Sequence, residues 1–274
     1  MYGKETMKYK ILALDMDGTV LDSNNQISER TLAAIRQAQK LGVIVIVATG
    51  RPWQSFQKYQ RTLQISHPII TYNGGMVISA DGREVLHHQK LSATSVLEII
   101  KLGKMYNISQ CMWANGRLYI IGETETLQHY AAEAGVAFEK AKDIECLAKS
   151  GVTKVLWYDI GERIAKCQNE LVEKLQAKDV SYFTSLQQYL EFVDIGVSKG
   201  IALSTIATQF GVEAHEVMAI GDGMNDISML NYAGLGIVMK NASDAVKEYA
   251  DYVTKTNDEH GVAIAIEHFI ASSE

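Results

Sequence analysis

The sequence predicts an α/β protein in which a doubly wound, mainly parallel, Rossmann-like sheet is interrupted by an inserted α+β domain. Near both ends of the chain, apolar runs long enough for buried strands alternate with amphipathic helical segments. Several of these runs end in polar turns that contain glycine, at the edge where open α/β sheets bind ligands. Between them the pattern changes to alternating strands with a hairpin signal. We therefore predict a discontinuous core of residues 1–82 and 189–274 and an inserted domain of residues 83–188.

The first part of the core is predicted to contain three strands and two helices. Residues 10–14 form an apolar strand, and Ser28 is a suitable N-cap for a helix that continues to Leu41. A second strand over 43–48, a helix over 53–63 and a strand over 68–72 follow. This strand–helix–strand order predicts parallel, right-handed connections.

The inserted domain is predicted to be an antiparallel sheet with helices on one face. Its clearest signal is the Asn115-Gly116 pair between two strand-like runs, because this dipeptide suits a type I′ hairpin turn. The remaining expected elements are helices over 93–106 and 162–177 and strands over 152–158 and 180–184.

The core pattern then resumes. We expect a helix that opens at Ser198-Lys199-Gly200 and continues to Phe210. The later elements are expected to be strands over 216–220, 235–239 and 251–254 and helices over 241–250 and 261–270.

Composition limits the classes of function. The chain has 274 residues, 47% of them hydrophobic, with only two prolines and a net charge of −6. No basic run offers a surface for nucleic acid or an anionic membrane, and no apolar stretch is long enough to span a bilayer. The polar start, in which Met7 is an alternative to Met1, resembles no signal peptide, so we expect a cytoplasmic protein. Cys111, Cys146 and Cys167 lack metal-ligand spacing and are expected to be free thiols.

Carboxylates gather where the predicted core strands end. Asp15 and Asp17 follow the first strand, Asp222 and Asp226 follow the strand over 216–220, and Thr49 ends the second strand. If these groups share one rim, each like-charged pair about 5 Å apart costs on the order of 3 kcal/mol at an effective dielectric constant of about 20. A cation must therefore lie among them, and hard oxygen ligands favour Mg²⁺.

The same residues resemble a known family. Asp-x-Asp-Gly-Thr at 15–19, Thr-Gly-Arg at 49–51, the lysine of Ser-Lys-Gly at 198–200 and Gly-Asp-Gly-x-Asn-Asp at 221–226 are similar, in this order, to the four motifs of haloacid dehalogenase superfamily phosphatases. The insertion between the second and third motifs resembles the C2-type cap of the Cof-type subfamily (subclass IIB). The resemblance covers essentially the whole chain, including Asn73-Gly74 and residues 257–266.

This resemblance implies a mechanism. Asp15 is expected to be the nucleophile that forms an aspartyl-phosphate, and Asp17 the acid that protonates the leaving oxygen and then activates water. Thr49 is expected to hydrogen-bond the phosphoryl group, and Lys199 to neutralise the phosphate and the nucleophile.

The resemblance also implies the binding residues. Mg²⁺ is expected to be held by Asp15, by the backbone carbonyl of Asp17 and by Asp222, with Asp226 as an outer or water-mediated partner. Residues expected to contact the substrate phosphate are Met16, Gly50 and Asn225. For Arg51, Asn73 and Asn241, loop-supplied contacts to the site and purely structural roles in turns and caps both remain open.

The leading hypothesis is thus a Mg²⁺-dependent phosphatase of small phosphorylated metabolites, with sugar phosphates or phosphorylated cofactors such as flavin mononucleotide or pyridoxal phosphate as the implied range. A phosphotransferase or phosphomutase of sugar phosphates would use the same nucleophile. A receiver-type signalling protein also places a phosphorylated aspartate on a parallel sheet. The presence of Asp17 and of a large inserted domain argues against that interpretation.

Overall fold

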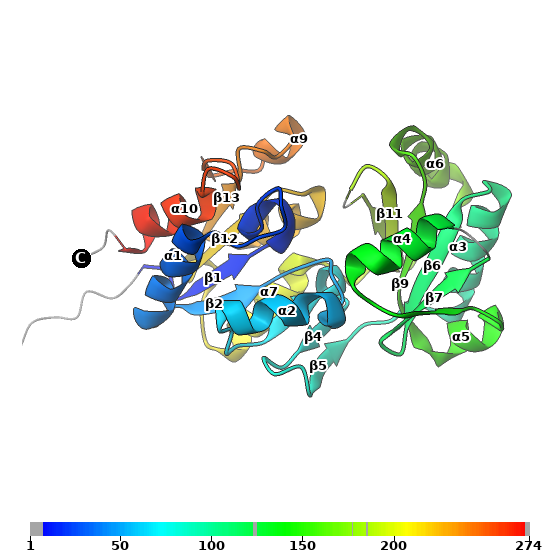
Figure 1. Cartoon of the computed structure of the whole chain (residues 1–274), viewed down its shortest axis with the longest axis horizontal. Coiled ribbons are helices and arrows are strands. Elements are labelled where there is room, and N and C mark those ends of the chain that lie inside the picture. Colours follow the sequence, from blue (N-terminus) through cyan, green and yellow to red (C-terminus); the bar gives the residue numbers. More distant parts are fainter. Residues whose placement is uncertain (1–7, 123–124, 177, 185, 272–274) are drawn as a thin grey trace, which may run out of the picture.

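The computed structural model describes residues 8–122, 125–176, 178–184 and 186–271, so the choice between Met1 and Met7 as the start lies outside the described residues. The chain forms two lobes, with the core coloured blue, cyan, yellow, orange and red and the inserted lobe mainly green (Figure 1). Among the described residues no helix is both long enough and apolar enough to cross a membrane.

The core is a five-stranded, wholly parallel sheet in the order β14-β13-β12-β1-β2. Its strands are almost entirely aliphatic because helices cover both faces. The strands are β1 (Ile11–Leu14), β2 (Ile44–Val47), β12 (Val217–Gly221), β13 (Leu235–Val238) and β14 (Tyr252–Val253).

The two faces of this sheet build two separate hydrophobic clusters. Leu12 and Leu14 point to one face, which is covered by α1 (Glu29–Lys40), α2 (Trp53–Leu63) and α10 (Gly261–Phe269). Ile11 and Ala13 point to the other face, covered by α7 (Lys199–Gln209), α8 (Ile227–Tyr232) and α9 (Asp244–Lys247). The predicted doubly wound α/β core is therefore confirmed.

A small antiparallel sheet extends the edge of the core. Its strands are β3 (Ile69–Thr71), β4 (Met76–Ile78) and β5 (Val85–His88). A bridge between Ala48 and Ile70 joins it to the parallel sheet beside β2. Short helical turns complete the core at η1 (Met16–Val20), η2 (Tyr72–Gly74), η3 (Ala214–Glu216) and η4 (Met224–Asp226).

The inserted lobe, called the cap below, contains a six-stranded sheet in the order β10-β11-β9-β6-β7-β8. In the hairpin, Asn115 and Gly116 have φ angles of 51° and 72°, as a type I′ turn requires. The strands are β6 (Ser109–Ala114), β7 (Arg117–Ile121), β8 (Phe138–Lys140), β9 (Val152–Tyr158), β10 (Val180–Phe183) and β11 (Tyr189–Asp194).

Two features of the cap differ from the expected antiparallel sheet with helices on one face. First, β7 and β8 pair in parallel, because α4 (Glu125–Ala134) provides a crossover between them. Second, α4 packs on the face opposite to α3 (Ala93–Met105), α5 (Ile144–Gly151) and α6 (Gly161–Lys174). Its side chains join Tyr72 and Met76 of the core in one cluster, so α4 lies between the cap sheet and the core (Figure 1).

Two further expectations are changed by tertiary pairing. The strand at 85–88 was expected in the inserted domain but pairs with β4 of the core. The strand at 189–194 was expected in the core but pairs with β9 and β10 of the cap. We therefore propose cap boundaries near residues 90 and 196. The helix expected over 241–250 is reduced to α9, because the Asn241 side chain instead contacts Gly18 and the backbone of Asn257.

The approach of α7 to α8 depends on Gly200. A Cβ atom at this position would lie 2.3 Å from the backbone oxygen of Ser228. We expect Gly200→Ala to lower the free energy of unfolding by about 2 kcal/mol, because backbone atoms must shift to relieve the overlap. Thermal denaturation measures this, with the neighbouring Ile201→Ala as control because Ile201 is 52% exposed. Equal melting temperatures for the two variants would contradict the packing argument.

Candidate active site

The candidate site lies where three parallel strands of the core end. Leu14 pairs with Ile220 of β12 on one side and with Val47 of β2 on the other. The residues that follow these strands must therefore meet at one edge of the sheet. The backbone N–H of Asp15 donates to the carbonyl of Ile220 at 3.0 Å, which fixes the start of this loop.

A buried lysine joins two of the acidic residues. Lys199 Nζ donates to Asp15 Oδ1 and to Asp226 Oδ1, each at 2.6 Å, and the lysine side chain is fully buried. Lys199 is the first residue of α7, whose N-cap Ser198 accepts a hydrogen bond from the N–H of Ile201. The sequence thus starts the helix at the position that directs this lysine into the acidic cluster.

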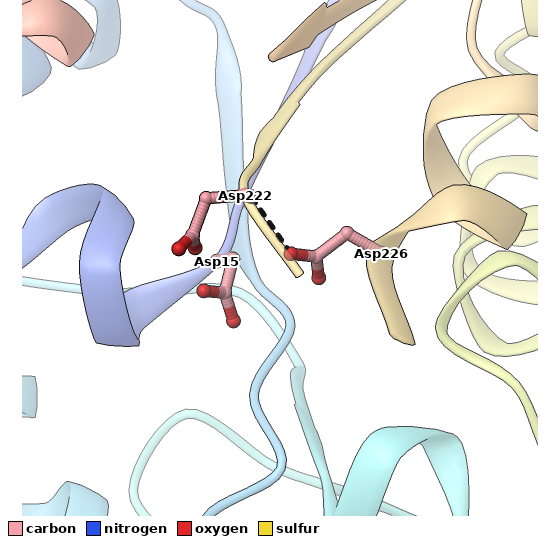
Figure 2. A group of neighbouring side chains, drawn as sticks. All are labelled: Asp15, Asp222 and Asp226. Atoms are coloured by element: carbon pink, nitrogen blue, oxygen red, sulfur yellow. Dashed lines mark hydrogen bonds between the residues drawn. The ribbon is translucent and has the colours of Figure 1, made fainter. Parts of the chain in front are cut away.

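Asp226 holds the loop that carries Asp222. Its Oδ2 accepts from the backbone N–H of Asp222 at 2.9 Å (Figure 2) and from that of Gly223 at 2.8 Å. Since its other oxygen accepts from Lys199, both carboxylate oxygens are already engaged. This arrangement suits a residue that holds the Asp222 loop in position and does not itself bind the substrate.

The side chains of Asp15, Asp222 and Asp226 offer three oxygens that lie within 4.8 Å of one another. Burial and the neighbouring Asp226 raise the pKa of Asp15 well above its usual range, and the same two causes raise the pKa of Asp222 to about 7. Burial lowers the pKa of Lys199, but Asp15 and Asp226 outweigh burial and raise it. The single positive charge of Lys199 does not balance three carboxylates. A hard divalent cation such as Mg²⁺ therefore fits this donor set.

The carboxylate of Asp222 is oriented by its neighbours. Thr19 Oγ1 donates to its Oδ1 at 2.9 Å, and Asn241 Nδ2 lies 3.4 Å from its Oδ2. The same Asn241 amide donates to the carbonyl of Gly18 at 2.9 Å. Gly18 has a φ of 73°, and a Cβ there would lie 2.3 Å from Asp222 Oδ2, so glycine allows the two loops to approach.

Asp17 lies outside this group of three carboxylates. Both of its oxygens accept from Arg51, from Nε at 2.8 Å and from Nη2 at 2.6 Å, and its side chain is half exposed. Arg51 in turn is placed by the turn after β2, where its N–H donates to Thr49 Oγ1 at 3.1 Å. The Asp17 side chain, which is predicted to transfer protons, is thus held by Arg51 at the solvent-exposed side of the site.

The remaining predicted residues converge on the same edge. Thr49 and Met16 are fully buried beside the strand ends. Asn73 Oδ1 accepts from Asn225 Nδ2 at 2.8 Å, and the Asn73 side chain packs against Gly50. The structure therefore brings Arg51, Asn73 and Asn241 to the site through hydrogen bonds, where the sequence left their roles open.

Three residues at the site were not predicted from the sequence. Thr19 is the last residue of the first motif, and its position there was the available signal. Lys154 and Glu191 belong to the cap, and Lys154 Nζ donates to the Gly50 carbonyl at 3.2 Å while Glu191 Oε2 accepts from Asn73 Nδ2 at 2.8 Å. For these two the usable signal was a charged residue within each of two otherwise mostly apolar strands.

A family model described as haloacid dehalogenase-like hydrolase matches residues 12–266. The chain belongs to this family. The match spans both parts of the core and the whole cap, so the predicted family resemblance is confirmed.

Similar proteins agree with this assignment. The 5-amino-6-(5-phospho-D-ribitylamino)uracil phosphatase YcsE of Bacillus subtilis is 34% identical, over 97% of this chain and 98% of its own. A haloacid dehalogenase-like hydrolase from Bacteroides thetaiotaomicron is 32% identical, with a TM-score of 0.82 over 95% of this chain and 99% of its own. A subclass IIB sugar phosphatase shares the fold, with a TM-score of 0.83 at 24% identity over 95% of this chain and 98% of its own. The prediction of an enzyme of the haloacid dehalogenase phosphatase class is confirmed at this level.

The pairing of Lys199 generates a prediction about stability. In metal-free buffer, Lys199→Met leaves the carboxylates of Asp15 and Asp226 buried without their cation, which typically costs about 3–5 kcal/mol. We expect a correspondingly lower midpoint of urea unfolding. The matched control is Lys240→Met, because Lys240 is exposed. An unchanged midpoint for Lys199→Met would contradict the role of this lysine as the charge that holds the acidic loops together.

Proposed function

We propose that the protein is a Mg²⁺-dependent phosphatase of small phosphorylated metabolites that works through an aspartyl-phosphate on Asp15. The observation that carries this proposal is the placement of Asp15. It lies at a strand end, in hydrogen-bond contact with Lys199, and within 4.8 Å of the carboxylates of Asp222 and Asp226. A carboxylate held between positive charges can attack phosphorus without repelling the anionic substrate.

In the first step an Asp15 oxygen forms a bond to phosphorus and the ester P–O bond breaks. Asp17 gives its proton to the departing alkoxide, which leaves as an alcohol. In the second step Asp17, now charged, takes a proton from water, and the water oxygen displaces Asp15 from phosphorus. Phosphate leaves and Asp15 is restored.

Arg51 bears directly on the role of Asp17. Both Asp17 oxygens accept from Arg51, so Arg51 fixes the position from which Asp17 would reach the leaving group. Thr49 and Lys199 hold the phosphoryl group from the buried side.

The residues that would hold Mg²⁺ are Asp15, Asp222 and the backbone carbonyl of Asp17, with Asp226 fixing the loop behind them. When bound, the ion supplies positive charge that offsets the negative charge of the phosphoryl group and the carboxylates. Asp15 and Asp222 provide the hard oxygen ligands that Mg²⁺ prefers.

We infer that the substrates are small phosphorylated metabolites, such as sugar phosphates or phosphorylated cofactors. The relative at 34% identity is named for a phosphorylated ribitylamino-uracil, a small metabolite with a sugar-derived chain and a heterocyclic ring. This supports the proposed range and makes phosphorylated ribityl compounds the first candidates in a screen.

The nucleophile is tested by Asp15→Asn. We expect a loss of activity of roughly 10⁴-fold or more toward p-nitrophenyl phosphate, because an amide cannot form the acyl phosphate. Circular dichroism should remain native, since the substitution removes one of several repelling charges. Asp244→Asn is the control, as the side chain of Asp244 is 99% exposed. Activity above one tenth of that of the unaltered protein would rule out Asp15 as the nucleophile.

The metal is tested by chelation. Treatment with EDTA should abolish phosphatase activity, and excess Mg²⁺ should restore it, because Asp15 and Asp222 otherwise repel the substrate. Asp222→Asn should raise the Mg²⁺ concentration for half-maximal activity by roughly tenfold or more, since one ligand loses its charge. Activity that survives exhaustive chelation would refute the proposal of a metal-dependent enzyme.

A further inference from the structure

A buried ion pair of the cap contacts the core directly beside the candidate active site. Lys154 on β9 and Glu191 on β11 lie 2.6 Å apart, Nζ to Oε1, and are 2% and 4% exposed. Both point from the cap sheet toward the core, among aromatic and aliphatic side chains such as Tyr72 and Trp113. Burying an ion pair carries a large desolvation cost, so stability alone gives little reason for one at this position.

The pair is connected to the site through the two loops that follow β2 and β3. Glu191 Oε2 accepts from Asn73 Nδ2 at 2.8 Å, and Lys154 Nζ donates to the carbonyl of Gly50 at 3.2 Å. The backbone N–H of Asn73 also donates to the carbonyl of Thr49 at 3.0 Å. The cap pair therefore contacts the Thr49–Gly50 loop directly through Lys154 and indirectly through Asn73.

The Glu191 carboxylate determines the donor and the acceptor in both hydrogen bonds that lead from it through Asn73 to Asn225. A charged Glu191 can only accept, so Asn73 must present its NH₂ group to the cap and its Oδ1 to the core. Asn225 must then donate its own NH₂ group to Asn73 Oδ1, as it does at 2.8 Å. Asn225 is adjacent to Asp226 and lies in the loop that carries Asp222.

We propose that Glu191, held by Lys154, is a positioning residue for catalysis: through Asn73 it sets the orientation of Asn225 and the position of the Thr49–Gly50 loop when the cap is docked. If the cap moves away, the Asn73 NH₂ group loses its acceptor on Glu191 and the Gly50 carbonyl loses its donor on Lys154. The positions of the active-site loops in the core therefore depend on the position of the cap. This inference rests on the proposed phosphatase function.

The test exchanges the charges of two partners. In Asn73→Asp, two carboxylates face each other across the position of the hydrogen bond, and we expect kcat for p-nitrophenyl phosphate to fall about 100-fold, as misplaced catalytic loops typically cause. In the double variant Asn73→Asp/Glu191→Gln, the new amide at position 191 donates to the new carboxylate at position 73. That carboxylate still accepts from Asn225, and Lys154 still has an acceptor. We expect kcat to return to within about tenfold of the unaltered protein.

Two further variants separate positioning from folding. Glu191→Gln alone keeps the size of the side chain but allows either amide to reverse, so we expect kcat to fall by roughly tenfold. Its melting temperature should also fall, because Lys154 is left buried without its counter-ion, and kcat is therefore measured well below the unfolding transition. Gln54→Met removes a different hydrogen bond between core and cap, from Gln54 Nε2 to the carbonyl of Gly116 at 2.7 Å. It should leave kcat unchanged, because Gln54 is not part of the series of hydrogen bonds that runs from Glu191 through Asn73 to Asn225.

Each of these results supports or overturns the inference. Rescue of kcat in the double variant supports positioning by Glu191, since a merely structural role would restore the melting temperature without restoring the rate. A folded double variant as slow as Asn73→Asp would overturn the inference, and so would an unchanged kcat in Glu191→Gln. If the unaltered protein with Mg²⁺ hydrolyses no phosphomonoester, the proposed function itself fails, which is a distinct result.

Discussion

The contact of Lys199 with Asp15 and Asp226 is the interaction on which the site depends. The parallel strands β1 and β12 bring acidic loops to one edge of the sheet, and their carboxylates would repel each other without a cation between them. Because Lys199 is the first residue of α7, the start of that helix cannot shift without breaking both contacts. The helix on one face of the sheet, the nucleophile at the end of β1 and the loop after β12 are therefore positioned together.

The buried positive charge also divides the roles among the carboxylates. Asp226 uses both oxygens on Lys199 and on backbone N–H groups, which leaves Asp15 and Asp222 as the carboxylates available to the proposed metal and substrate. Asp17 lies apart, paired with Arg51 at the open side. Acidic residues that look alike in the sequence thus have different surroundings, and those surroundings suit nucleophile, ligand, scaffold and proton carrier.

Tertiary pairing supplied what local patterns could not predict. Strands β5 and β11 each pair with strands on the far side of a predicted boundary, because the sheet that a strand joins depends on distant partners. The contact of Lys154 and Glu191 with Gly50 and Asn73 requires the cap sheet to face the core, and the position of α4 depends on its packing against both the cap sheet and the core. The role of Asn241 was also undecided until its loop was placed beside Gly18.

The sequence by itself determined the doubly wound core, the hairpin at Asn115-Gly116 and the set of motifs at the strand ends. Hydrophobic periodicity and turn composition are local properties, and the loops after parallel strands must meet at one edge of their sheet. Only the tertiary structure decided which carboxylates share Lys199, where Arg51 holds Asp17 and which cap residues reach the site. Arg51 and Asp17 are more than thirty positions apart in the sequence. Lys154 and Glu191 are each more than a hundred positions from the core residue that they contact. No local pattern specifies the register and packing that bring such distant residues together.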